Sequence, residues 1–240
     1  MNTKLQKIYE ERAKFYNLEL STFESEGATV LEVESLRNEN YFTIAEFDKH
    51  LVIRVDPEME LLFDKTMTSG KSPKELLNII EAHYKNLGRT LSKTFCFYYY
   101  LKDEKLNVES DLMIERITNS NSGKLDVFLD GLSEEEIDLA DIELDNLDPV
   151  IFGGFVQGNM KGYVSHRYPN GHTGLADIGI VIDQAYRGKR FGKAMLVHEV
   201  NWCLRNEIIP MYVLLDSNES SKGLVESLGF EKICDLYMLE

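Results

Sequence analysis

The sequence is poor in cysteine, with only Cys96, Cys203 and Cys234 among its 240 residues. They lie too far apart for a CxxC metal or redox motif, and an odd number cannot form a complete set of disulfides. Cysteine used in this way is typical of reduced thiols buried in a core. The sequence therefore predicts inert core thiols and no metal.

Long apolar runs are also missing. The first twenty residues mix charged and apolar side chains and lack the apolar core of a signal peptide, and no later run is long enough to span a bilayer. We therefore expect a cytoplasmic protein without a membrane segment.

Basic residues are in deficit, with 26 Lys and Arg against 41 Asp and Glu and a formal net charge of -15 at pH 7. Because affinity for phosphate backbones comes from basic surface, this balance argues against nucleic acid and anionic membranes as partners. Cationic or neutral partners fit better. The remaining composition, 43% hydrophobic and 28% charged, is typical of a folded globular protein.

The chain is long enough for one large domain or two modest ones, and we expect two, at residues 1–108 and 109–240. In the first half, a helix is followed by predicted strands, a helix and two further strands. That second helix opens with Ser72 as N-cap, Pro73 at its first position and Glu75 three residues after the cap. The predicted strands lie at 28–36, 41–47, 50–56, 94–101 and 110–118, and the helix at 72–88.

In the second half, the residue pattern predicts a hairpin that turns at 157–159. Strands that alternate with helices are expected after it. A short helix is expected after Ser133, which again has a Glu three residues later, at Glu136. Strands are predicted at 177–182, 211–216 and 230–240, with helices from about Gly192 and over 218–229. Strands that first meander and then alternate with helices imply an α/β fold with a mixed sheet covered by helices.

Positive charge is concentrated in one short stretch, "RGKRFGK". Arg187, Lys189, Arg190 and Lys193 fall within seven positions, where a strand ends and a helix begins. Unpaired amides and the positive end of the helix dipole would point into the same space, although acidic residues are the favoured choice at such a position. Gly188 and Gly192, which lack Cβ atoms, would let a phosphate approach the backbone. We therefore expect this stretch to bind a polyanion.

This stretch resembles the signature of the GNAT superfamily of acetyl-CoA-dependent N-acetyltransferases. "IVI" at 180–182 is similar to the family's L-x-V strand, and "RGKRFG" at 187–192 to its [QR]-x-x-G-x-[GA] loop. "NESSKGLVESLGF" resembles a second family segment, in which Asn218, Gly229 and Phe230 match. The resemblance covers about 112–240 and implies a GNAT-like acyl-CoA N-acyltransferase fold with an additional N-terminal α/β domain. The strand, helix, strand order of that domain is compatible with a degenerate GNAT-like unit.

Two positions depart from the family pattern. Arg190 replaces the first signature glycine, where it would either crowd the phosphates or add a salt bridge to them. Val225 replaces the tyrosine that often protonates the departing thiolate, and no spacing argument selects a substitute among Tyr186, Tyr212 and Ser221.

The resemblance implies acetyl-CoA as cosubstrate, with no metal expected. Asp177, in "ADIG" where many members have A-E-I-G, is the implied base, and His166 and His172 are weaker alternatives. An oxyanion donor is implied where the fourth strand bulges, near 180–182. The implied coenzyme-binding residues are Ile180, Val181, Ile182, Arg187, Gly188, Lys189, Arg190, Phe191, Gly192, Lys193 and Asn218.

The predicted function is transfer of the acetyl group of acetyl-CoA to a primary amine of a small molecule or peptide, by direct attack in a ternary complex. The acidic chain favours a cationic acceptor. One alternative, suggested by Arg190 and Val225, is a catalytically inactive coenzyme-A sensor or protein-interaction module. Another is a module that binds a different nucleotide. A monomer and a homodimer are both compatible with the sequence.

Overall fold

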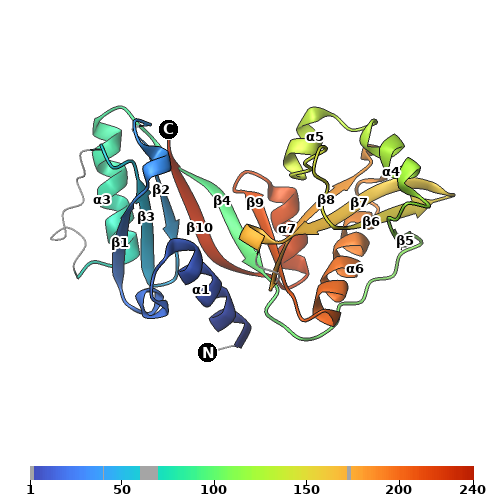
Figure 1. The fold of residues 1–240 in the computed structure, drawn as a ribbon, viewed down its shortest axis with the longest axis horizontal. Helices are drawn as coiled ribbons and strands as arrows, with labels where there is room; N and C mark the ends of the chain where they lie inside the picture. The colour runs from blue at the N-terminus through green and yellow to red at the C-terminus, as the bar shows by residue number, and fades with distance from the viewer. Residues whose placement is uncertain (1–2, 40, 60–69, 172–173) are drawn as a thin grey trace. The chain divides into compact units, whose positions relative to one another are not determined.

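The computed structural model describes residues 3–39, 41–59, 70–171 and 174–240 (Figure 1). The chain forms two compact units. Unit 1 comprises Met1–Tyr98, Val213–Glu219 and Lys232–Glu240, and unit 2 comprises Tyr99–Tyr212 and Ser220–Glu231. No helix in the described part of the chain has the length and apolar composition that a membrane span requires.

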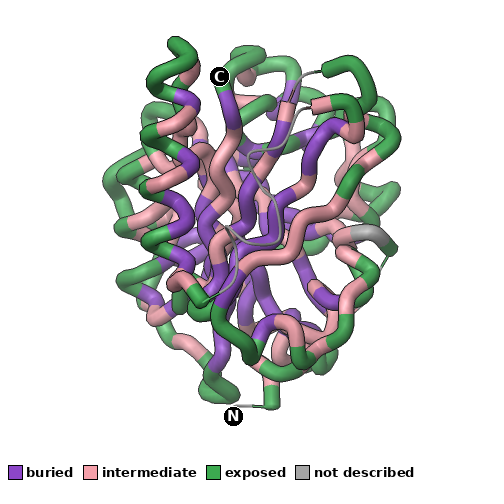
Figure 2. Tube along the Cα trace, turned by 90° about the vertical axis from the view of Figure 1, so that its left-hand side faces the viewer, coloured by how far each residue is buried: buried purple, intermediate pink, exposed green. Residues whose placement is uncertain are grey.

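Unit 1 is built on a mixed sheet in which the strands follow the order β1-β3-β2-β10-β4. β1 runs parallel to β3, whereas β2 is antiparallel to both β3 and β10. Figure 2 shows that most buried residues lie in strands, while the helix turns alternate between buried and exposed. The elements are α1 (Thr3–Tyr16), η1 (Leu20–Glu24), β1 (Gly27–Glu32), η2 (Glu34–Leu36), β2 (Phe42–Glu46), β3 (His50–Val55), α3 (Pro73–Asn86), β4 (Leu91–Tyr99) and β10 (Glu231–Leu239).

Unit 2 has strands in the order β9-β8-β7-β6-β5, and only the β8–β9 pair is parallel. β9 and α7 each contribute residues to both units, as do β4 through Tyr99 and β10 through Glu231. The elements are β5 (Met113–Arg116), α4 (Ser122–Leu129), α5 (Glu134–Leu139), β6 (Val150–Val156), β7 (Asn159–Arg167), η3 (Pro169–Gly171), β8 (Leu175–Ile182), η4 (Gln184–Tyr186), α6 (Phe191–Arg205), β9 (Ile209–Leu215) and α7 (Glu219–Ser227).

The strands of unit 2 lie between α4 and α5 on one side and α6 on the other (Figure 1). Side chains of a strand alternate between faces, so β8 serves both layers. Val181 packs into the cluster that contains the apolar residues of α4, whereas Ala176 packs with Cys203 of α6. Asp177 and Gly179 share the face of Val181. A Cβ at Gly179 would collide with the carbonyl oxygen of Ala140, so the end of α5 can approach β8 only over a glycine.

The structure confirms most of the predicted elements. Both capping boxes are present, with Ser72 accepting from the amide of Glu75 and Ser133 from that of Glu136. The β6–β7 turn lies at Gln157 and Gly158, with φ of 50° and 80°. The predicted strand at 110–118 is only four residues long, and α4 begins after it, at Ser122, in a stretch rich in Asn and Ser. The boundary between residues 108 and 109 stays a prediction, since the compact units are not separated by a single cut.

Candidate active site

The loop between β8 and α6 presents a continuous row of backbone donors. Gly188 and Arg190 both have left-handed conformations, with φ of 72° and 64°, and α6 begins directly after Arg190. The first intrahelical bond runs from the amide of Ala194 to the carbonyl of Arg190. Among the described residues, the six amides from 188 to 193 have no hydrogen-bond acceptor. Six adjacent N–H groups at a helix start form a positive cradle for an anion.

The basic side chains of this loop fall into two groups. Arg187 folds back, because its Nε donates to the carbonyl oxygen of Ile182 at 3.0 Å and its guanidinium pairs with Glu136. This arginine therefore holds the loop against β8 and α5. Lys189 and Arg190 are exposed and Lys193 is half-buried, so their charges remain at the surface around the amides.

Aromatic contacts order the other side of the loop. Tyr186 stacks on Phe191 with ring centroids 5.6 Å apart, and the Nζ atoms of Lys189 and Lys161 lie 4.7 and 5.2 Å from its ring centroid. Cations at these distances are attracted to the ring face. Lys161 also pairs with Asp183 at 2.9 Å, which keeps the pKa of that carboxyl below its ordinary value. The loop is thus shaped by contacts with the end of the sheet.

β8 has an edge that extends beyond its pairing with β9. The amide of Ile209 donates to the carbonyl of Gly174, and the amide of Asp183 donates to Lys161 on β7. The N–H and C=O groups of successive residues in a strand point to opposite sides, so those of the even-numbered residues of β8 point away from β7. Pairing with β9 runs from Leu175 to Asp177, so the N–H and C=O of Ile180 lie beyond the paired segment. The register with β7 is regular from Asp177 to Ile182, so the bulge expected near 180–182 is absent from this pairing.

Asp177 is opposite Met211 where the two strands stop pairing. The aspartate charge acts on the hydroxyl of the next residue, Tyr212. Burial is the main reason that the pKa of Tyr212 is raised to about 12, and the hydrogen bond from Ser221 opposes the rise only in part. The structure therefore joins an acidic group from β8, a phenol from β9 and a hydroxyl from α7.

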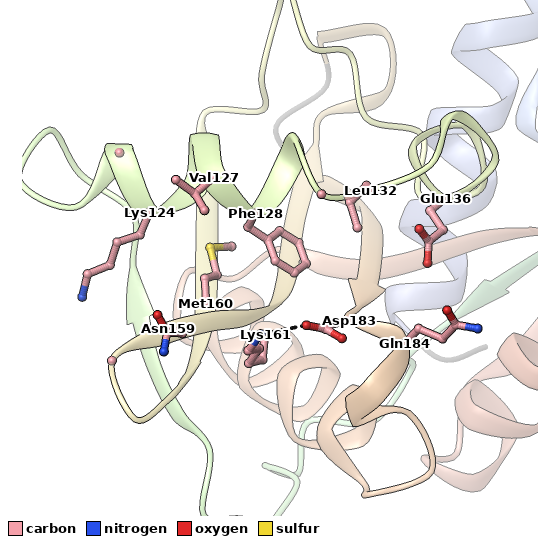
Figure 3. A pocket seen from close by; sticks show the side chains of 13 residues that line it. Lys124, Val127, Phe128, Leu132, Glu136, Asn159, Met160, Lys161, Asp183 and Gln184 are labelled. Atoms are coloured by element: carbon pink, nitrogen blue, oxygen red, sulfur yellow. Dashed lines mark hydrogen bonds and ion pairs between the residues drawn. The ribbon is translucent and has the colours of Figure 1, made fainter.

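A cavity of about 600 Å³ adjoins the basic loop (Figure 3). Phe128 of α4 and Met160 of β7 supply its apolar surface, and the Lys161–Asp183 pair lies on its wall. Glu136, which holds Arg187, also lines it. A cavity with an apolar surface and a few charged groups suits a small molecule with both polar and apolar parts.

Other residues named from the sequence have different positions. His166 is 0% exposed and bonded to Glu199 in the layer between β7 and α6, so it does not share the face of Asp177. His172 lies outside the described residues. Val225 is 0% exposed, so the position of the family tyrosine is part of the core here. Asn218 lies one residue before α7.

Comparison with known proteins identifies the class of the C-terminal part of the chain. Residues 117–230 match the family model of the acetyltransferase (GNAT) family. No curated protein is similar in sequence at a significant level. A GNAT-family acetyltransferase from Colwellia psychrerythraea shares the fold, with 16% identity over 78% of this chain and 75% of its own, and a TM-score of 0.50.

Two further solved structures are similar over part of the chain. A GNAT-family protein from Novosphingobium aromaticivorans is 15% identical over 63% of this chain and 66% of its own, with a TM-score of 0.45. A ribosomal-protein-alanine N-acetyltransferase from Brucella melitensis is 16% identical over 54% of this chain and 99% of its own, with a TM-score of 0.39.

Residues 117–230 thus form a GNAT acetyltransferase domain, and the family and fold predicted from the basic stretch are confirmed. Members of this family transfer acyl groups, and the match supports acyl transfer in general for these residues.

Proposed function

We propose that this protein transfers the acetyl group of acetyl-CoA to a primary amine of a small molecule or peptide. The observation that supports this most directly is the row of six unpaired amides from 188 to 193 among the described residues, surrounded by basic side chains. A pyrophosphate has the charge and the acceptor oxygens that such a cradle binds.

The residues predicted to hold the coenzyme form a continuous path. The amides of 188–193 would take the pyrophosphate, with Lys189, Arg190 and Lys193 around it. Ile180, with its backbone groups beyond the β8–β9 pairing, would bond the pantetheine arm, and Val181 and Ile182 complete that strand segment. Gly192 leaves room, because a Cβ there would meet only Ile182 and Leu224 at 3.7 and 3.9 Å. Asn218 stays a prediction from the resemblance.

The chemistry requires two proton movements. A lysine-like amine has a pKa of about 10.4, so deprotonating it at pH 7 costs about 4.6 kcal/mol, and Asp177 would accept that proton directly or through water. As the amine nitrogen bonds the acetyl carbon, the carbon–sulfur bond breaks and the thiolate takes a proton. Tyr212 keeps its own proton across the physiological range because its pKa is about 12, and it is our candidate donor.

The acceptor is an amine that is cationic in solution. The net charge of -15 favours the approach of cations at low ionic strength. Thiol release measured with a panel of amines tests this, and faster turnover of cationic than neutral amines, with the difference reduced by salt, is the expected result.

Calorimetric titration with coenzyme A tests the coenzyme site. In Gly192→Asp the new Cβ makes only ordinary van der Waals contacts, and the charge at a helix start favours the helix. The same charge would repel phosphate, so we expect unchanged folding and at least about tenfold weaker coenzyme binding, or 1.4 kcal/mol. Lys74→Glu, an exposed charge reversal on α3, is the matched control and should bind normally. Absence of coenzyme binding by the unmodified chain would refute the proposal.

A coenzyme-A sensor without turnover is the second candidate. It is favoured by Val225, which buries an apolar side chain where the family donor stands. Tight coenzyme binding with no thiol release for any amine would identify the protein as such a sensor.

A further inference from the structure

A second cluster of reactive side chains lies in the core of unit 2, on the face of the strands opposite to Asp177. His166 of β7, Glu199 and Cys203 of α6 are all buried, and one ligand atom from each lies within 4.8 Å of the others. Glu199 Oε1 lies 2.5 Å from His166 Nδ1 and 4.0 Å from Cys203 Sγ. Imidazole, carboxylate and thiol thus converge on one point between a strand and a helix.

One polar atom of this cluster has no hydrogen-bond partner in the part of the chain that the structure describes. Glu199 is 0% exposed, and its second oxygen, Oε2, has no hydrogen-bond partner among the described residues. A buried carboxylate oxygen without a partner costs free energy, because it has lost water and gained nothing in return. A cation held between the three side chains and bound by both oxygens of the Glu199 carboxylate would supply the missing interaction.

We propose that His166, Glu199 and Cys203 bind one divalent transition-metal ion, with Zn²⁺ as the expected ion. A thiolate, an imidazole and a carboxylate are the zinc ligands of proteins, and soft sulfur disfavours Mg²⁺ and Ca²⁺. Two negative ligands and one neutral ligand balance a double positive charge, which matters in a site without solvent. The Cys203 thiol loses its proton to solvent when the metal binds.

The geometry requires only small movements. In tetrahedral zinc sites with bonds of about 2.0–2.3 Å, ligand atoms lie about 3.3–3.8 Å apart. The His166–Glu199 pair would open and the Glu199–Cys203 pair would close by about 1 Å or less to reach that range. The Tyr168 hydroxyl, 3.4 Å from His166 Nε2, would orient the imidazole from the side of the ring opposite to Nδ1, and a water would complete the coordination.

The bound ion would cross-link α6 and β7. Glu199 and Cys203 are one turn apart on the helix whose first residues form the amide cradle, and His166 is on the strand beneath it. Metal binding would therefore stabilise the fold without touching the coenzyme site, which makes this proposal independent of the proposed function.

Metal content and cobalt spectroscopy test the proposal on the full chain. After removal of metals with a chelator and dialysis against Zn²⁺, we expect one zinc per chain and a higher melting temperature. Co²⁺ in place of zinc should give a thiolate-to-cobalt charge-transfer band in the near ultraviolet. Cys203→Ala and Glu199→Gln should lose at least about 90% of the bound metal, whereas Cys96→Ala and Cys234→Ala, matched buried cysteines of unit 1, should keep it.

The proposal is overturned if the unmodified chain binds no stoichiometric zinc, or if Cys203→Ala binds it as well as the parent does. Should a variant fail to fold, the cobalt spectrum of the unmodified chain decides alone, because absence of the charge-transfer band excludes a thiolate ligand.

Discussion

Arg190 has a backbone conformation that favours glycine, and this explains the glycine of the family signature. Its φ of 64° places a side chain with a Cβ in the left-handed region, which costs about 1–3 kcal/mol. Glycine avoids this cost and loses about 0.5–1 kcal/mol of conformational entropy instead.

We therefore expect Arg190→Gly to raise the free energy of unfolding by about 1 kcal/mol, measured by urea denaturation. Arg116→Gly, an exposed arginine in a strand, is the control and should lower it. Destabilisation of both variants to the same extent would show that Arg190 is not strained.

Tyr212 is the residue whose loss should separate chemistry from binding. Tyr212→Phe removes the proposed proton donor, and we expect kcat for acetyl transfer to fall about 10- to 100-fold with coenzyme affinity unchanged. The fall is modest because a thiolate with a pKa near 8.5 leaves with little help.

Tyr163→Phe is the matched control for this change. Tyr163 is also buried in unit 2, burial raises its pKa to about 12, and it lies in the cluster under α4. Its replacement should leave kcat unaffected, and an equal loss in both variants would exclude Tyr212 as the donor.

At the scale of elements, the contact between β8 and α5 depends on one glycine. In Gly179→Ala the new Cβ meets the carbonyl oxygen of Ala140, so strand and helix must separate, and we expect a loss of about 1–3 kcal/mol in thermal or chemical unfolding. Gly223→Ala, inside α7 with nothing near the new Cβ, should instead gain about 0.5–1 kcal/mol. A neutral Gly179→Ala variant would mean that α5 does not approach β8 this closely.

Elements with local signals could be predicted from the sequence. Two helices could be predicted from their capping boxes, because a capping box is formed within four residues. These are Ser72 with Glu75 and Ser133 with Glu136. α4 has no such signal, because Asn121 at its N-cap makes no side-chain capping bond and the residues around it have turn composition. Its helix is stabilised by Leu125, Phe128 and Leu129 packing on the sheet, which no local pattern shows.

The candidate site was predictable to a similar extent. The basic stretch could be located because its charges are adjacent in sequence. Tyr212 could not be chosen over Tyr186 or Ser221, since only the fold brings the charge of Asp177 to act on its hydroxyl. Glu199 was missed for the same reason, because its partner His166 is 33 residues away on another element.

The whole molecule should lose stability in alkaline solution. Burial raises the pKa of Cys96 and Cys234 from 9.0 to about 12, and that of Tyr163 and Tyr212 from 10.0 to about 12. The unfolded chain therefore releases these protons at pH 9–10, while the folded chain holds them to about pH 12. Stability from these groups is complete below pH 9 and is lost as the pH rises towards 12, by up to about 1.4 kcal/mol per pH unit for each group.

Urea denaturation at pH 8, 9.5 and 11 measures this dependence. Tyr163→Phe should reduce the slope above pH 10 by the contribution of one proton. A free energy of unfolding that stays constant up to pH 11 would contradict the buried state of these four side chains.

The position of β10 has a consequence for biosynthesis. This strand, Glu231–Leu239, pairs with β2 inside unit 1, although about 185 residues separate them in the chain. During translation at roughly 5–20 residues per second, the N-terminal sheet must wait about 9–37 s for its missing strand. Folding of this protein therefore cannot proceed in order from the N-terminus, and the nascent chain holds an open edge at β2 until nearly all of the 240 residues have been made.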